Sequence, residues 1–312
     1  MNTRSLAGSI VGSILAGLRA GIALVLISAN TVLHVTPLLL VALVKMLVRV
    51  RAVRKPLDYV LMWLAESWIG VNSWMMARLT DTRVSVEGQP ELNLNGHVLV
   101  ISNHQSWVDI PVLQRLFNRR LPLLRFFLKS QLIWVPLLGL AWWALDFPFM
   151  KRYSREQVQR RPELAGRDIE ATRAACRKFR EIPVAVMNFV EGTRYTPAKH
   201  LSQNSPFRHL LRPRSGGVAF VLDALSDSID TIVDVTIAYP GFERARPRLL
   251  DLCANRIREI RVSIRTEPVP PFLRGLDYQG NPEHRARFQA WINELWTRKD
   301  HELDRLLGPA SV

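Results

Sequence analysis

One uncharged segment near the N-terminus restricts the folds open to this chain more than any other feature. From Ala20 to Val44 there is no Asp, Glu, Lys or Arg over 25 residues. A helix of that length, rising about 1.5 Å per residue, is long enough to cross a hydrocarbon core of roughly 30 Å. A cleaved signal peptide is the alternative, but the run is too long for one and lacks an Ala-x-Ala-like exit. The sequence therefore predicts a membrane helix, in which His34 and Pro37 allow a kink or a return to the same side.

The charges around this segment predict how it is oriented. Two arginines, Arg4 and Arg19, precede it, and five cations follow it: Lys45, Arg49, Arg51, Arg54 and Lys55. By the positive-inside rule, the rest of the protein then lies on the cytoplasmic face of the inner (cytoplasmic) membrane. A second stretch, residues 59–77, is apolar apart from Glu66 and contains three tryptophans, which predicts a helix lying in the interface. Residues 1–82 are thus predicted to anchor the protein.

The overall charge indicates a polyanionic partner. Forty-two Lys and Arg against 27 Asp and Glu give a formal net charge of +15. Nucleic acid and anionic lipid headgroups both attract such a chain, and the apolar N-terminus favours anionic membrane lipids. A membrane-tethered nucleic-acid binder predicts aromatics interleaved with cations on one face, whereas these cations cluster beside the membrane segment, in loops and near the C-terminus. We therefore expect no nucleic-acid partner.

Cys176 and Cys253 lie far apart without metal-ligand spacing and indicate a reducing compartment.

Beyond residue 82, strand-like and helical patterns alternate. Alternation of this kind predicts an α/β domain with a largely parallel central sheet flanked by helices, here over residues 83–275. The predicted strands cover residues 83–87, 98–102, 143–150, 183–189, 231–239 and 260–265, and the predicted helices cover 110–117, 167–179 and 216–225. Two polar stretches, 153–166 and 196–217, read as loops over a ligand or as surface. A charged amphipathic helix is predicted over 282–307, within a C-terminal segment of residues 276–312.

A heptapeptide, residues 103–109, carries the first chemical signal, because it stands where a strand passes into a helix. Histidine accepts and returns protons near neutral pH, and a carboxylate can orient it, so His104 and Asp109 form two thirds of a nucleophile-activating triad. No nucleophile is evident nearby, which suggests that the activated hydroxyl belongs to a substrate. The alternative is an ordinary loop histidine and a first-turn carboxylate that complements the helix dipole.

Two further motifs also follow apolar strands. In residues 188–196, Gly192 lets the backbone turn sharply, Arg194 offers a planar fork for phosphate oxygens, and Glu191 can hold that guanidinium or bind a substrate hydroxyl. Lys151 and Arg152 follow Phe149 at the end of another predicted strand. Alone, each motif is also typical of a charged turn on the surface. These two motifs and the heptapeptide all follow predicted strands. Ligands of open α/β sheets bind outside the carboxyl ends of the strands, so the motifs are predicted to share one site.

Taken jointly, the motifs resemble the glycerolipid acyltransferase family. Its hallmarks are a His-x4-Asp block, matched by His104 and Asp109, and a Phe-Pro-Glu-Gly-Thr-Arg block, matched by residues 189–194 with Val190 in place of the proline. Residues 103–109 also resemble the first block of one branch of the family, Asn-His-Gln-Ser-Trp-x-Asp. This branch comprises 1-acylglycerol-3-phosphate and lysophospholipid acyltransferases. Its second block, which often carries a glycine and an isoleucine-rich approach to the arginine, is matched here by Lys151 and Arg152 alone.

The resemblance implies an enzyme that acylates a lysophospholipid. His104, oriented by Asp109, would take the proton from a glycerol hydroxyl as it attacks an acyl thioester of coenzyme A or acyl carrier protein, and no metal or cofactor is expected. The residues implied to bind the acceptor's glycerol phosphate are Glu191, Gly192, Thr193, Arg194, Arg152 and Lys151. The expected acceptor is 1-acylglycerol 3-phosphate, which would give phosphatidic acid. Another lysophospholipid acceptor, or a non-catalytic lipid-binding protein of the same fold, stays open.

Overall fold

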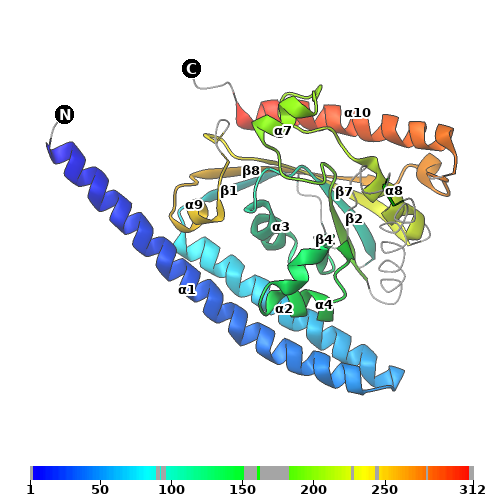
Figure 1. The fold of residues 1–312 in the computed structure, drawn as a ribbon, viewed down its shortest axis with the longest axis horizontal. Helices are drawn as coiled ribbons and strands as arrows, with labels where there is room; N and C mark the ends of the chain where they lie inside the picture. The colour runs from blue at the N-terminus through cyan, green and yellow to red at the C-terminus, as the bar shows by residue number, and fades with distance from the viewer. Residues whose placement is uncertain are drawn as a thin grey trace.

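A six-stranded sheet forms the centre of the protein (Figure 1). The computed structural model describes residues 3–88, 92, 96–150, 160–161, 183–225, 228–242, 246–278 and 280–308. The strands of the sheet are β1 (Arg83–Glu87), β2 (His97–Ser102), β3 (Leu124–Phe126), β6 (Ala185–Phe189), β7 (Ile229–Ala238) and β8 (Glu259–Pro268). Their order is β1-β8-β7-β2-β6-β3, and every pair is parallel except β7 and β8. The predicted α/β fold with a largely parallel sheet is confirmed.

Helices cover both faces of this sheet, which explains why its central strands are apolar throughout. Along β2, Val98 and Val100 point to one hydrophobic cluster, whereas Leu99 and Ile101 point to the other, and all four are almost fully buried. The first cluster includes residues from α2 (Arg51–Leu79) and α3 (Asp109–Phe117); the second includes residues from α8 (Ser215–Ala224) and α10 (Pro282–Leu307). The strand therefore holds the residues that follow it in a rigid position.

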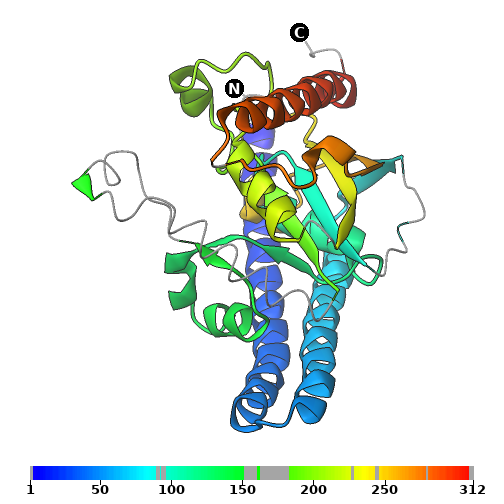
Figure 2. The ribbon, with the colours of Figure 1, turned by 90° about the vertical axis from the view of Figure 1, so that its right-hand side faces the viewer.

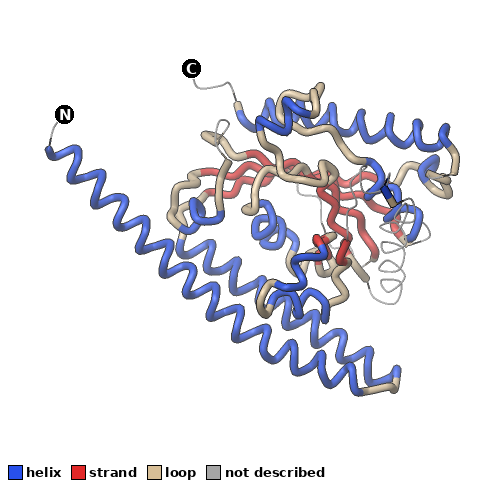
Figure 3. Tube along the Cα trace, in the orientation of Figure 1, coloured by secondary structure: helices blue, strands red, loops and turns tan. Residues whose placement is uncertain are grey.

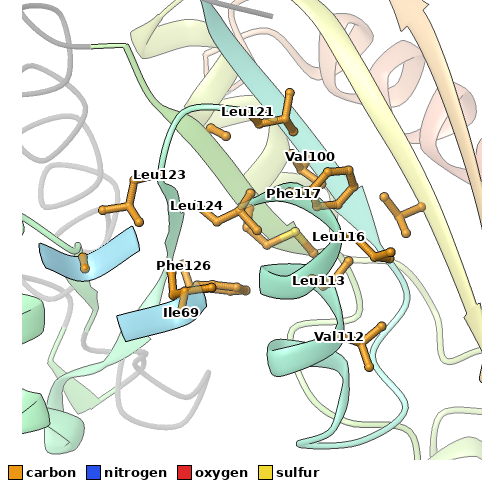
Figure 4. Close-up of a cluster of buried hydrophobic side chains, with 14 of the residues drawn as sticks. Ile69, Val100, Val112, Leu113, Leu116, Phe117, Leu121, Leu123, Leu124 and Phe126 are labelled. Atoms are coloured by element: carbon orange, nitrogen blue, oxygen red, sulfur yellow. The ribbon is translucent and has the colours of Figure 1, made fainter. Parts of the chain in front are cut away.

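The helix α3 is held against the sheet by one apolar face. Val112, Leu113, Leu116 and Phe117 recur at helical spacing, and Figure 4 shows them gathered beside Val100 of β2. The same cluster takes in Ile69 of α2 and, from β3 and the chain before it, Leu121, Leu123, Leu124 and Phe126. Because this face is buried along its length, the first residue of α3, Asp109, has a fixed place at the carboxyl end of β2.

The helix α10 is part of the core in spite of its many charges. Its bounds, Pro282–Leu307, match the predicted helix, and Asn281 caps its start by accepting from the backbone N–H groups of Glu283 and His284. Its apolar stripe, including Phe288 and Trp296, packs on the sheet. Buried Lys299 donates to Asp234 Oδ1 at 2.5 Å and to the Val235 carbonyl at 2.7 Å, which ties α10 to β7.

The two N-terminal helices lie side by side along the other face (Figures 1 and 2). The first, α1 (Thr3–Leu47), continues through Pro37 as one helix, and Ile14–Leu47 is long and apolar enough to cross a membrane by length and composition. Polar pairs join it to α2: Asn30 Nδ2 donates to Asn72 Oδ1 at 2.9 Å, and His34 Nε2 lies 3.1 Å from Ser67 Oγ. The second helix is longer than the predicted 59–77. Its inner face packs on the domain, so α2 lies between α1 and the sheet.

Between β3 and β6 the sequence-based prediction is wrong in one place. Residues 143–150 do not form one strand: α4 (Leu138–Ala144) runs into this range, and Asp146 has a positive φ of 59° that breaks the chain direction. Only β5 (Phe149–Met150) is extended, and it pairs with β4 (Leu128–Lys129) in a separate two-stranded sheet. A short buried helix and a buried strand share the same apolar composition, so the sequence pattern does not distinguish them.

Several short elements complete the chain. They are η1 (Ser130–Trp134), α7 (Pro197–Ser202), α9 (Leu249–Cys253) and η3 (Pro271–Leu273). The helix α7 lies inside the polar stretch 196–217 that was predicted as a loop, and Thr196 caps it by accepting from the Lys199 N–H. The helix predicted over 167–179, and most of the polar stretch 153–166, fall outside the described residues.

Candidate active site

The structure brings His104 and Asp109 together at the carboxyl end of β2. His104 Nδ1 lies 2.8 Å from Asp109 Oδ2. The same carboxylate oxygen accepts from the backbone N–H groups of Gln105 at 2.7 Å and Ser106 at 2.9 Å. His104 and Asp109 can meet although they lie five positions apart in the sequence, because residues 104–108 form a tight turn. The Asp109 carboxylate, at the start of α3, accepts hydrogen bonds from that turn. We call residues 103–109 the His–Asp turn.

A tyrosine completes the surroundings of Asp109. The Tyr239 hydroxyl donates to Asp109 Oδ1 at 2.6 Å, so the two carboxylate oxygens accept four hydrogen bonds in all. Complete burial, with the neighbouring Asp109 charge, raises the pKa of Tyr239 well above its ordinary value, so the phenol stays protonated and donates. Asp109 is itself fully buried. The carboxylate is therefore held in one orientation, and it can stabilise positive charge on His104.

The His104 ring is fixed from the side by the second motif. Phe189, the last residue of β6, stacks on the imidazole with ring centroids 3.9 Å apart and planes 14° apart. The His104 carbonyl also accepts from the Tyr195 N–H at 2.8 Å. Because Nδ1 faces Asp109, Nε2 points away from the pair, and 13% of the side chain is exposed. The imidazole is thus placed as a proton acceptor that a substrate can reach.

Residues 191–194 turn beside this histidine and present one cation, Arg194, next to which α7 places a second, Lys199. Gly192 has a φ of 67°, a conformation that favours glycine, and its N–H donates to the Phe189 carbonyl at 2.8 Å. The exposed Arg194 guanidinium lies 4.6 Å from the centre of the Trp107 ring, which belongs to the His–Asp turn. Lys199 Nζ donates to Thr193 Oγ1 at 2.6 Å and to the Arg194 carbonyl at 3.0 Å. Thr193, Arg194 and Lys199 therefore form a basic corner next to His104.

Glu191 occupies a different environment from the rest of its motif. Its side chain is fully buried. Burial, and next the Asp109 charge, raise the pKa of Glu191 well above its ordinary value, against the opposing influence of the His104 backbone and Arg246. The carboxyl group lies beneath the His–Asp turn and not on the surface that Arg194 shares. A direct contact between Glu191 and an acceptor stays a prediction.

Three residues outside the His–Asp turn, Ile237, Arg246 and Pro247, hold it in place, and the sequence did not indicate these contacts. The side chain of Asn103 pairs with Ile237 of β7 in both directions, donating to its carbonyl and accepting from its N–H at 2.9 Å. Ser106 Oγ donates to the Pro247 carbonyl, and Arg246 Nη1 donates to the Gln105 carbonyl at 2.8 Å. The end of β7 and the chain after it therefore clamp the turn. The sequence offered one indication of these contacts: Arg246 and Pro247 come after a predicted strand, as the other site motifs do.

The remaining predicted site residues, Lys151 and Arg152, lie outside the described part of the chain. Within that part, no group of three or more His, Cys, Asp or Glu side chains is placed to hold a metal ion.

Comparison with known proteins places the chain. A model of the family described as Acyltransferase matches residues 83–240, which begins at β1 and ends just after β7. This chain belongs to the acyltransferase family. It is 26% identical over 227 residues to a mouse protein named 1-acyl-sn-glycerol-3-phosphate acyltransferase epsilon, covering 66% of this chain and 57% of that one.

Two further likenesses extend this picture. The acyltransferase is 25% identical over 255 residues to the Saccharomyces cerevisiae 2-acyl-1-lysophosphatidylinositol acyltransferase, covering 70% of this chain and 64% of the yeast protein. The crystal structure of the 1-acyl-sn-glycerophosphate acyltransferase PlsC from Thermotoga maritima matches with a TM-score of 0.53 at 17% identity, covering 95% of this chain and 97% of that one, which shows a shared fold. The chain spans little more than half the length of the mouse relative it matches.

Tyr239→Phe tests whether the hydroxyl that faces Asp109 positions the acyltransferase's His–Asp pair. A hydrogen bond to a charged group contributes about 1.5 to 3 kcal/mol. If about half of this free energy stabilises the transition state more than the bound substrates, kcat should fall about tenfold. KM values for both substrates should stay unchanged, because Tyr239 is buried behind the carboxylate. The control is Tyr278→Phe, which removes a hydroxyl paired with Ser215 on α8. Equal kcat values for the two variants would contradict a positioning role for Tyr239.

Proposed function

We propose that this acyltransferase moves a fatty acyl group from an acyl thioester to the free hydroxyl of 1-acylglycerol 3-phosphate, giving phosphatidic acid. The observation that carries the proposal is the 2.8 Å pairing of His104 with a buried carboxylate beside a basic corner. The Ser106 hydroxyl is engaged by the Pro247 carbonyl and the Val108 N–H, and Cys253 is buried in α9, so neither is poised to attack. The attacking oxygen then belongs to the substrate.

The reaction needs one proton transfer in each direction. His104 Nε2 takes the proton of the glycerol hydroxyl as that oxygen attacks the thioester carbonyl, and Asp109 stabilises the imidazolium that forms. The tetrahedral intermediate collapses, the carbon–sulfur bond breaks, and the departing sulfur takes the proton back from His104. The products are an ester and a free thiol. No acyl-enzyme and no cofactor are required, and the thiol carrier is either coenzyme A or acyl carrier protein.

The acceptor's phosphate is assigned to the basic corner. Arg194 offers two parallel N–H groups to phosphate oxygens, and Lys199 adds a second charge from the start of α7. Thr193 and the Gly192 backbone lie in the same turn, and Lys151 and Arg152 are further candidates from the sequence. The relatives named for 1-acyl-sn-glycerol-3-phosphate support a phosphomonoester acceptor. The yeast relative named for a lysophosphatidylinositol supports the alternative, a larger headgroup.

The enzyme is proposed to work at the cytoplasmic face of the inner membrane. Support comes from α1, of whose most apolar window only 17% is buried within the protein, and from the cations that follow it. The net charge of +15 favours association with anionic lipids. The acceptor, itself a membrane lipid, would then reach the site without leaving the surface.

A substrate panel tests this function. Purified protein in detergent is assayed with 1-acylglycerol 3-phosphate, lysophosphatidylinositol, lysophosphatidylcholine and monoacylglycerol, each with an acyl-coenzyme A and an acyl carrier protein thioester. We expect the highest kcat/KM for 1-acylglycerol 3-phosphate. A higher value for lysophosphatidylinositol would establish the larger headgroup instead. Binding of the lipids without any transfer would show a non-catalytic lipid-binding protein.

A further inference from the structure

A second uncharged segment interrupts the α/β domain, far along the chain from α1. Residues 130–145 contain no Asp, Glu, Lys or Arg and include Trp134, Trp142 and Trp143. They form η1 and α4, inserted between the paired strands β4 and β5. At 16 residues the segment is too short to cross a bilayer as a helix, since about 20 residues are needed. We call it the tryptophan segment.

The tryptophan segment is apolar on its outer side as well as its inner side. Leu138 and Trp142 pack toward the core, and together with Val35 and Leu38 of α1 they line one small apolar cavity. On the outer side, Trp134 is 84% exposed, Trp143 55% and Leu140 52%. These three exposed side chains stand within 10 residues of chain, and large contiguous apolar patches are rare on monomeric proteins surrounded by water. The outer side therefore fits a partner that is itself apolar.

The exposed side chains stand on a tightly built support. A Cβ atom at Gly139 would lie 2.0 Å from the Ile133 carbonyl oxygen, so η1 and α4 approach each other as closely as glycine permits. Leu137, between them, has a φ of 61°, which non-glycine residues seldom adopt. Backbone strain of this kind persists where the surroundings impose it. The outward position of Trp134 and Leu140 is thus a feature of the fold.

The position of the segment beside α1 identifies what covers it. Figures 1 and 2 both place α4 next to the α1–α2 pair, and α4 contacts α1 directly. Within the candidate span, α1 also exposes apolar residues such as Leu33 and Leu40. The tryptophan segment therefore packs directly against the one helix of the described chain that is apolar and long enough to enter a bilayer. Tryptophan is also the side chain that favours the boundary between headgroups and acyl chains.

We propose that the tryptophan segment is a second membrane contact, through which the α/β domain itself dips into the lipid interface by Trp134, Leu140 and Trp143. The segment follows β4, which comes directly after β3 of the central sheet. The Phe126 ring of β3 lies 6.0 Å from the Phe189 ring that stacks on His104. The contact therefore holds the end of the sheet that carries His104 toward the lipid surface. This membrane contact goes beyond the proposed reaction, because the contact does not depend on which lipid is the acyl acceptor.

Site-specific labelling tests this contact in the full-length protein. In a background with Cys176→Ser and Cys253→Ala, an environment-sensitive fluorophore is attached to Leu140→Cys or to Leu201→Cys. Leu201 is the matched control, since it lies on α7 and is 78% exposed. Each protein is bound to vesicles of equal parts phosphatidylcholine and phosphatidylglycerol, with or without a nitroxide on the acyl chains. We expect emission from position 140 to shift to shorter wavelength and to be quenched severalfold by the nitroxide, and emission from position 201 to do neither.

The other outcomes overturn the proposal. A label at position 140 that is as exposed to water as the one at position 201 would show that the segment does not touch lipid. A blue-shifted label that the lipid nitroxide does not quench would show a protein contact, with a second copy if the shift grows with protein concentration. Because α1 is intact in both proteins, the comparison is made at equal membrane attachment.

An activity measurement adds an independent readout. The variant Trp134→Ser/Leu140→Ser/Trp143→Ser should show a severalfold higher apparent KM for an acceptor embedded in vesicles, but an unchanged KM for a short-chain acceptor dissolved in water. Leu201→Ser should change neither value. Equal KM values in vesicles for the triple variant and the wild type would contradict the proposal, whatever the acceptor proves to be.

Discussion

Replacing His104 with alanine is expected to abolish acyl transfer while the protein stays folded and bound to membranes. A positioned general base contributes about a hundred- to ten-thousandfold in rate, and Asp109, the other basic side chain of the His–Asp turn, is fully buried. The fold should survive because the imidazole is partly exposed and because Asp109 keeps three other hydrogen bonds, from Gln105, Ser106 and Tyr239. Steady-state turnover of the purified variant measures the loss of acyl transfer, and its melting temperature measures whether the fold is retained.

The control for this loss is His301→Ala, which removes an exposed histidine from α10. Turnover near the wild-type rate by His104→Ala would rule out the proposed mechanism.

Asp109→Asn should also reduce the rate by orders of magnitude, and the structure identifies why. An asparagine can turn its oxygen to the three donors on one side and its NH₂ group to Tyr239 on the other, so His104 keeps its tautomer. What is lost is the negative charge that stabilises the imidazolium. A variant with unchanged kcat would show that this charge plays no part.

Arg194→Ala is expected to weaken binding of the acceptor by about ten- to a hundredfold in apparent KM. The charge-assisted, bidentate contact to a phosphate contributes about 1.5 to 3 kcal/mol, and about 1.4 kcal/mol corresponds to a factor of ten. The donor KM should hardly change. Arg194→Lys should recover only part of the loss, because an ammonium group keeps the charge but lacks the planar fork. Since Arg194 is exposed and rests on Trp107, the fold should not depend on it.

The acceptor itself supplies the decisive control for Arg194. A neutral acceptor such as a monoacylglycerol should be insensitive to Arg194→Ala, and Arg208→Ala, which removes an exposed arginine paired with Asp304, should affect no substrate. If the donor KM rises in Arg194→Ala and the acceptor KM does not, the arginine belongs to the site of the thioester carrier.

The elements with strong local signals were predictable from the sequence. The bounds of α10 follow from Asn281, Pro282 and a regular apolar stripe, and β2 and α3 follow from a change of hydrophobic period around residues 103–109. The segment 143–150 was not predictable, because it is divided between the end of α4, which packs on α1, and the short strand β5, which pairs with β4. Composition alone does not say which partner an apolar run will meet.

The sequence by itself determined the α/β class and the positions of His104, Asp109 and Arg194 just beyond strands, because hydrophobic periodicity and turn chemistry act within a few residues. The tertiary structure alone decided what surrounds them. Tyr239 reaches Asp109 across 130 residues of chain, and the clamp formed by Asn103 and Ile237 spans 134. Such contacts exist because parallel strands bring their carboxyl ends to one edge of the sheet, and the pairing order that does so is set by packing over the whole domain.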